Sequence, residues 1–354
     1  MSRFWNAKTT ETKPYTPGEQ PSAGVKYIKI NTNENPYPPS PKVYEAINNS
    51  CNEELRLYPN PEGLEARTAF ASANNLDVNQ VFVGNGSDEV LAMAFMAFYD
   101  NLNPIMILDI SYSFYPVYCK RLDVAYNTIP VNNDFTINVD RFLEPSGGVV
   151  IANPNAPTSI AICLDDIKSI LEAHPNNVVI IDEAYIDFGG ESAIPLIAEY
   201  ENLLVVQTLS KSRSLAGMRI GFAAGNPQLI EGLDRVKNSF NSYTIDRLAI
   251  VAAKAALEDT EHFTNNVNKI IKTREYVVDE LKSLGFGVLD SKANFIFITH
   301  SKFVAKDIFM YLKTKGILVR YFDLPRVSDY LRVTIGTDYE MCIFIEKIKK
   351  FIEV

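Results

Sequence analysis

The lysine at position 211 is the residue of this sequence best suited to covalent chemistry. It lies in the serine-rich turn of residues 208–215. A lysine amine forms an imine only when it is neutral, and cationic neighbours such as Arg213 and Arg219 favour the neutral amine. Ser210 and Arg219 are also suited to a phosphate group, the arginine through the two parallel hydrogen bonds of its guanidinium. The ordinary alternative is a solvated surface lysine.

An aspartate closes the apolar run of residues 178–181. A carboxylate at the end of a buried strand is costly unless it has a partner, and a protonated ring nitrogen is such a partner. Tyr185, three positions after Asp182, can donate a hydrogen bond to a ring oxygen; alternatively, Asp182 only caps the next segment. Together with Lys211 and Arg219, this aspartate predicts a pyridoxal-phosphate (PLP) site, because that cofactor needs only a few protein groups around it.

Two further stretches follow strand-like runs. The stretch of residues 84–89 (GNGSDE) precedes a helical pattern, so its backbone can approach a phosphate at a helix N-terminus. Ser87 and Asp88 are equally suited to an ordinary helix cap and first turn. Tyr112, after the apolar run 105–109, can stack on a flat ring or pack in the core. The chain has no GxGxxG motif, which disfavours a nicotinamide-dependent dehydrogenase.

Two arginines in the C-terminal part lie in apolar strand patterns. Arg332 stands between Leu331 and Val333, and Arg320 closes the run of residues 317–319. A charge in such a position requires a fixed anion, such as an amino-acid carboxylate, or else lies on an edge strand that faces solvent.

Composition restricts the classes of function. The 354 residues are 47% hydrophobic, and the net charge of -9 argues against a nucleic-acid surface. Four scattered cysteines and three histidines show no metal-ligand spacing, so we expect reduced thiols and no metal site. No apolar run is long enough to span a membrane and the N-terminus has no apolar leader, so we expect a cytoplasmic protein.

Alternating strand and helix patterns must position these residues. Short apolar runs at 81–84, 105–109, 149–152, 178–182, 203–208 and 219–224 predict an α/β fold with a parallel or mixed sheet covered on both faces. Most of the polar residues above fall at the carboxyl ends of these runs, where such sheets bind ligands. A long helical region at about 227–284 and a small α+β unit follow, and residues 7–24 are expected to form an extended arm.

With these residues assembled, the chain resembles the fold-type I PLP-dependent aminotransferases, and among them the histidinol-phosphate aminotransferases. The resemblance runs from about Lys13 to the C-terminus, and its most specific stretches are 13–21 (KPYTPGEQP), 31–37 (NTNENPY), 58–59 (YP) and 210–219. It implies a large PLP-binding domain at 45–255 with a mostly parallel seven-stranded sheet between helices. It also implies a small α+β domain at 25–44 and 256–354, and an N-terminal arm at 1–24.

The resemblance also implies roles for the cofactor-binding residues. Lys211 would bind the cofactor covalently and then carry the proton, Asp182 would pair with the pyridine nitrogen, and Tyr185 would bond the ring oxygen. Tyr112 would stack on the ring. The phosphate end would be held by Ser87, Asp88, Ser210 and Arg219, and by Tyr58 from the neighbouring subunit of a homodimer.

One departure from the family pattern affects the ring oxygen. Where the family usually has NNPTG, residues 155–159 of this chain are NAPTS. The asparagine that touches the ring oxygen aligns with Ala156. Either Asn155 takes over that contact as a cofactor neighbour, or Tyr185 holds the oxygen with less help.

For the substrate, the resemblance implies that Arg332 takes the α-carboxylate of glutamate, and that Tyr15, Asn33 and Arg320 help to recognise a phosphorylated substrate. The implied reaction is transamination between histidinol phosphate and 2-oxoglutarate, giving imidazole-acetol phosphate and glutamate in histidine biosynthesis. A threonine-phosphate decarboxylase and an aromatic amino-acid aminotransferase remain alternatives on the same fold. A catalytically inactive scaffold is disfavoured by the complete set of lysine, aspartate, tyrosine and arginine.

Overall fold

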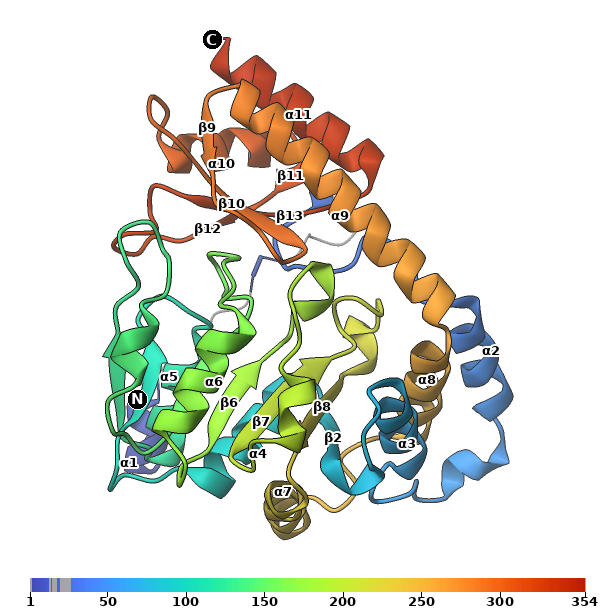
Figure 1. Cartoon of the computed structure of the whole chain (residues 1–354). Coiled ribbons are helices and arrows are strands. Elements are labelled where there is room, and N and C mark those ends of the chain that lie inside the picture. The colour runs from blue at the N-terminus through green and yellow to red at the C-terminus, as the bar shows by residue number, and fades with distance from the viewer. Residues whose placement is uncertain (1, 13, 15–17, 20–26, 354) are drawn as a thin grey trace.

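The computed structural model describes residues 2–12, 14, 18–19 and 27–353. Its centre is a seven-stranded sheet in the order β2-β8-β7-β6-β5-β3-β4 (Figure 1). The strands are β2 (Val81–Asn85), β3 (Ile105–Leu108), β4 (Tyr126–Ile129), β5 (Val149–Ala152), β6 (Val179–Asp182), β7 (Leu203–Thr208) and β8 (Ile220–Gly225). Only β8 runs antiparallel to its neighbours. The predicted α/β class with a mostly parallel sheet is therefore confirmed.

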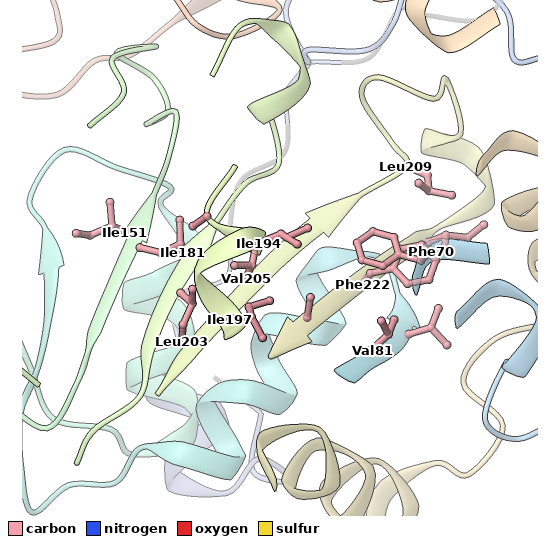
Figure 2. Close-up of a cluster of buried hydrophobic side chains, with 14 of the residues drawn as sticks. Phe70, Val81, Ile151, Ile181, Ile194, Ile197, Leu203, Val205, Leu209 and Phe222 are labelled. Atoms are coloured by element: carbon pink, nitrogen blue, oxygen red, sulfur yellow. The ribbon is translucent and has the colours of Figure 1, made fainter. Parts of the chain in front are cut away.

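Helices cover both faces of this sheet because successive strand residues point to opposite sides. Val179 and Ile181 face one apolar cluster, and Ile180 between them faces another. The first cluster packs under α3 (Leu64–Ala73), α6 (Leu164–Ala173) and α8 (Arg247–Glu258). The second packs under α4 (Ser87–Phe98), α5 (Phe114–Leu122) and α7 (Pro227–Phe240). Figure 2 shows side chains of the first cluster, including Ile151, Ile181 and Val205 on neighbouring strands.

A smaller sheet lies beyond the carboxyl ends of the central strands, at the top of Figure 1. Its antiparallel order is β12 (Arg320–Tyr321), β13 (Leu331–Thr334), β10 (Phe295–His300) and β9 (Phe286–Val288). Beside it, β1 (Ile28–Lys29) pairs in parallel with β11 (Ile317–Leu318). A separate apolar cluster packs these strands against α9 (Thr260–Ser283), α10 (Ala305–Thr314) and α11 (Asp338–Ile352).

The structure corrects three sequence expectations. The helical region at 227–284 is three helices, because the side chains of Asp246 and Asp259 cap new N-termini at α8 and α9. The expected strand at 317–320 is divided between β11 and β12, which pair with different partners. The arm at 7–24 is not extended throughout, since α1 (Ala7–Glu11) begins at the N-cap Asn6.

The remaining helices are short or peripheral. They are α2 (Pro41–Ser50) and the 3-10 helices Glu53–Arg56, Val78–Gln80, Val139–Phe142, Ile186–Phe188, Ile194–Ala198 and Ala216–Met218. The predicted domain boundaries at 44/45 and 255/256 fall inside α2 and α8. The division into these two domains stays a prediction.

The loop between β12 and β13 joins the smaller sheet to the larger one. Its Arg326, at a left-handed φ of 68°, donates from Nη1 to the Oδ2 of Asp109 at 2.9 Å. From Nη2 it donates to the carbonyl oxygens of Val131 and Asn132, each at 2.8 Å. Arg326 therefore ties this loop to the segments that follow β3 and β4.

Candidate active site

A cavity of about 400 Å³ lies where the carboxyl ends of the central strands meet the smaller sheet. It brings together most of the residues predicted from the sequence, although they are spread over 300 positions of the chain. The predicted residues that line it are Asn33, Ser87, Asp88, Tyr112, Asp182, Tyr185, Ser210, Lys211, Arg219, Arg320 and Arg332.

Asp182 ends β6 and turns its carboxylate into this cavity. The side chain is buried, and burial raises its pKa to about 6. Two donors hold the carboxylate: the hydroxyl of Tyr115 donates to Oδ2 at 2.7 Å, and the backbone N–H of Ala184 donates to Oδ1 at 3.2 Å. A buried carboxylate that faces a cavity is suited to a cationic ligand group.

Lys211 lies in the loop after β7, and its Nζ is 5.6 Å from the ring centroid of Tyr185. The side-chain amide of Asn35 holds this loop by donating to the carbonyl oxygens of Lys211 at 2.9 Å and Ser212 at 3.2 Å.

Arg213 does not line the cavity that contains Lys211. Its guanidinium lies 3.7 Å from the ring centroid of Phe263 and lines a second cavity behind the loop. Arg213 is therefore not the cationic neighbour of Lys211 that the sequence suggested.

The N-terminus of α4 forms another wall of the cavity. No side chain caps this helix, so the N–H groups of its first turn remain available to a ligand. The strand β8 approaches closely: a Cβ at Gly221 would lie 2.3 Å from the backbone nitrogen of Ser87. Arg219, at a left-handed φ of 52°, pairs with Asp88 at 3.2 Å. Helix N–H groups and a guanidinium beside serine hydroxyls form a suitable site for phosphate.

Two tyrosines, the kind of side chain expected around a flat ring, also line the cavity. The hydroxyl of Tyr112 donates to Asp88 Oδ1 at 2.7 Å, which fixes the tyrosine ring beside the cavity. The hydroxyl oxygen of Tyr185 accepts from Asn33 Nδ2 at 3.0 Å. Because Asn33 supplies the donor, the Tyr185 O–H is left to donate to another oxygen.

Two arginines face the cavity from the smaller sheet. Arg320 and Arg332 lie directly opposite each other on β12 and β13. Arg332 donates from Nη2 to the carbonyl oxygen of Asn31 at 2.9 Å, and its guanidinium lies 5.3 Å from the ring centroid of Phe295. Like charges directly opposite on neighbouring strands repel, so an anion between them would stabilise the pair.

Two predicted residues are placed outside the cavity, and a third is not described by the structure. Asn155 is fully buried and does not line the cavity. Both donors of its amide are engaged, one by Ile110 O at 2.9 Å and one by Thr158 Oγ1 at 3.0 Å. The wall at this point is formed by Ala156 and the following proline. Tyr58 is exposed and stacks on Tyr243 at 4.6 Å, away from the cavity of its own chain. Tyr15 lies outside the described residues.

Two residues that contribute to this arrangement were not found from the sequence. Asn35 belongs to the stretch 31–37 that carries the resemblance, but only Asn33 was selected from it. Tyr115 stands inside an aromatic helix pattern that is equally typical of core packing.

In the described part of the chain, no cluster of histidine, cysteine and acidic residues could hold a metal ion. Among the described helices, none is both long and apolar enough to cross a membrane.

The described residues therefore fit a flat ligand with a phosphate at one end and a protonated nitrogen at the other. The α4 N-terminus and Arg219 suit the phosphate, and Asp182 suits the nitrogen. Lys211 lines the same cavity, with its Nζ beside the ring of Tyr185. PLP has this distribution of groups, together with an aldehyde that a lysine amine can attack.

Comparison with known proteins gives a consistent result. The family model described as aminotransferase class I and II matches residues 25–348. A curated histidinol-phosphate aminotransferase of Clostridium acetobutylicum is 56% identical over 352 residues, covering 99% of this chain and 100% of the relative. A curated relative with the same description from Clostridium botulinum (strain Okra) is 54% identical, with 99% of each chain covered.

The fold also matches a solved structure. The histidinol-phosphate aminotransferase of Sinorhizobium meliloti, solved in complex with pyridoxal-5'-phosphate, superposes with a TM-score of 0.88 over 99% of both chains at 22% identity. The family match spans all three sheets and every described residue of the cavity except Gly18. This chain belongs to the aminotransferase class I and II family.

Proposed function

We propose that this chain catalyses PLP-dependent transamination between histidinol phosphate and 2-oxoglutarate, giving imidazole-acetol phosphate and glutamate in histidine biosynthesis. The observation that carries the proposal is the identity of 54–56% over 99% of the chain to relatives described as histidinol-phosphate aminotransferases. The cavity supports it, because it combines a lysine, a buried carboxylate and three arginines.

The cofactor would be held at both ends. Ser87, Asp88, Ser210 and Arg219 would surround its phosphate, and Asp182 would hold the proton on the ring nitrogen. The O–H of Tyr185 would donate to the ring oxygen while Asn33 donates to Tyr185. Ala156 offers no donor there, and Asn155 is engaged elsewhere, so Tyr185 would hold that oxygen with less help. When bound, PLP supplies an electron sink that stabilises negative charge at the substrate α-carbon.

Lys211 would act first as the covalent attachment point and then as the base. Once its amine is released by the incoming substrate, Nζ would take the proton from the substrate α-carbon and deliver it to the cofactor carbon to which Lys211 had been attached. Asn35 supports this role because it holds the carbonyl groups of both Lys211 and Ser212.

The two arginines would bind the anionic parts of the substrates. Arg332 would take the α-carboxylate of glutamate, and Arg320 would help to bind the phosphorylated substrate with Asn33 and Tyr15. A guanidinium suits both groups because it can donate two parallel hydrogen bonds.

The active unit would be a homodimer in the cytoplasm. Tyr58 is exposed and lies outside the cavity of its own chain, which leaves it available to a neighbouring subunit. There it would reach the cofactor phosphate of the neighbouring site.

A panel of acceptors tests the reaction. Purified protein with PLP and glutamate is given imidazole-acetol phosphate, its unphosphorylated counterpart or an aromatic keto acid, and 2-oxoglutarate is measured. We expect kcat/KM for the phosphorylated imidazole compound to exceed the others by roughly 10–100-fold, as for lost hydrogen bonds to a charged group. Equal rates with the aromatic acid, or carbon dioxide release from threonine phosphate without 2-oxoglutarate formation, would contradict the proposal.

A further inference from the structure

We propose that Tyr115 is a positioning residue that fixes the Asp182 carboxylate from behind the cavity wall. The carboxylate is then already oriented and ionised when a cationic ring nitrogen binds. The inference rests on the proposed function, because it assigns to Asp182 a ring nitrogen as its ligand. Tyr115 itself does not line the cavity.

The geometry carries this assignment. Tyr115 lies in α5, and its side chain is 0% exposed. Its hydroxyl donates to Asp182 Oδ2 at 2.7 Å while Ala184 N donates to Oδ1 at 3.2 Å, so each carboxylate oxygen already has one donor from the protein. These two bonds fix the plane of the carboxylate and leave further acceptor capacity on the cavity side.

The ring of Tyr115 is itself held on two sides. It stacks on Phe95 at 6.4 Å and meets Tyr112 edge to face at 5.5 Å. A rigid donor behind a functional group reduces the reorganisation needed when the ligand arrives. Tyr115 can therefore act on the cofactor only through Asp182 and through the packing of Tyr112.

Charge supports the same role. Burial raises the pKa of Asp182 to about 6, and the bond from Tyr115 is the largest opposing influence. The other charged groups that act on Asp182 are Asp88, which raises its pKa, and Lys211, which lowers it. Burial holds the pKa of Tyr115 well above its ordinary value, so this hydroxyl remains a donor across the working pH range. Without Tyr115, we expect Asp182 to bind its proton more tightly and to be partly neutral at pH 7.

The test compares Tyr115→Phe with Tyr99→Phe as a matched control. Tyr99 is buried in the same cluster beside Phe95, but its hydroxyl donates to the carbonyl oxygens of Val149 and Val178. The dissociation constant of PLP from the apoprotein is measured by equilibrium dialysis between pH 6 and 9. Both tyrosine variants are also measured in an Asp182→Asn background, which removes the carboxylate.

We expect Tyr115→Phe to weaken PLP binding roughly tenfold at pH 7, as for loss of a hydrogen bond to a charged group, and Tyr99→Phe to change it less than about twofold. The Tyr115→Phe effect should shrink as pH rises to 9, because the carboxyl ionises again, and should disappear in the Asp182→Asn background. Equal effects of the two variants, or a Tyr115→Phe effect that persists without the carboxylate, would overturn the inference. Failure of the unmodified protein to bind PLP would instead refute the proposed function.

Discussion

Asp182 and Glu183 are adjacent carboxyl groups at the end of β6, and their surroundings give them different properties. Asp182 faces the cavity, whereas Glu183 accepts from Ala193 N at 2.6 Å, from Ser192 Oγ at 2.7 Å and from Gln207 Nε2 at 2.8 Å. Burial raises the pKa of Glu183 to about 7 in spite of these bonds. Glu183 is therefore a structural group that titrates near neutral pH.

This titration predicts a pH dependence of stability. Since the folded protein binds a proton at Glu183 more tightly than the unfolded chain does, its contribution to stability is greatest below the ordinary glutamate pKa and is lost as pH rises through about 7. Relative to Glu183→Gln, which cannot titrate, the unmodified apoprotein should lose up to about 3 kcal/mol of unfolding free energy between pH 4.5 and 8. Urea unfolding at several pH values measures this difference. A difference that stays constant with pH would refute the prediction.

Lys211 gives the most direct test at this scale. Lys211→Ala should lower turnover by roughly 10²–10⁴-fold or more, because the variant loses its proton carrier. It should also lose the borohydride-fixed cofactor label on the peptide that contains position 211. Lys254→Ala is a suitable control, since Lys254 lies on α8 and pairs only with Glu258 among the contacts described. Label retained after Lys211→Ala would show that another amine binds the cofactor.

At the scale of elements, the contact between β8 and the first turn of α4 shapes the phosphate end of the cavity. Gly221→Ala would place a methyl group 2.3 Å from Ser87 N, so strand and helix must separate. We expect a loss of about 1–3 kcal/mol of unfolding free energy from this overpacking, with weaker PLP binding in the same variant. Gly217→Ala is the matched control, because a Cβ there meets nothing within 4 Å. Equal stability and PLP affinity in both variants would contradict this account of the phosphate site.

Asn35 gives a second prediction at this scale. Its amide joins the segment after β1 to the backbone of Lys211 and Ser212. Asn35→Ala should lower kcat about tenfold with a small change in the KM for glutamate, because the lysine is less well positioned while Arg332 is unchanged. Steady-state kinetics measure both constants. A rise in KM alone would assign Asn35 to substrate binding instead.

The sequence predicts the central strands well because strands buried on both faces form continuous apolar runs, as at residues 178–181. The strand β4 was not predicted, since it is an edge strand whose residues are mostly exposed. The same reasoning located the polar residues at strand ends. It did not locate Asn35 or Tyr115, whose contacts with Lys211 and Asp182 join positions 176 and 67 residues apart. Such contacts depend on how remote segments meet, which local patterns do not encode.

At the scale of the whole molecule, the proposed dimer makes each site depend on two chains. When Lys211→Ala subunits are mixed with Tyr58→Ala subunits, half of the dimers should contain one subunit of each kind, and each of these mixed dimers has one intact site. About a quarter of all sites should therefore bind PLP and turn over normally. Activity and PLP retention are measured at limiting cofactor after the subunits are exchanged. If Tyr58 served the site of its own chain, mixing would create no intact site and activity would not recover.

Arg326 has a consequence for movement within the molecule. It connects the loop before β13 to Asp109, a residue 217 positions away that shortly precedes Tyr112. Arg332, which is expected to bind the substrate carboxylate, lies on β13, the strand that follows this loop. If the smaller sheet moves when a substrate binds, either the three hydrogen bonds of Arg326 break or the Tyr112 segment moves with the sheet. Through these bonds, binding of the amino donor at Arg332 would shift the Tyr112 segment on the other side of the cavity.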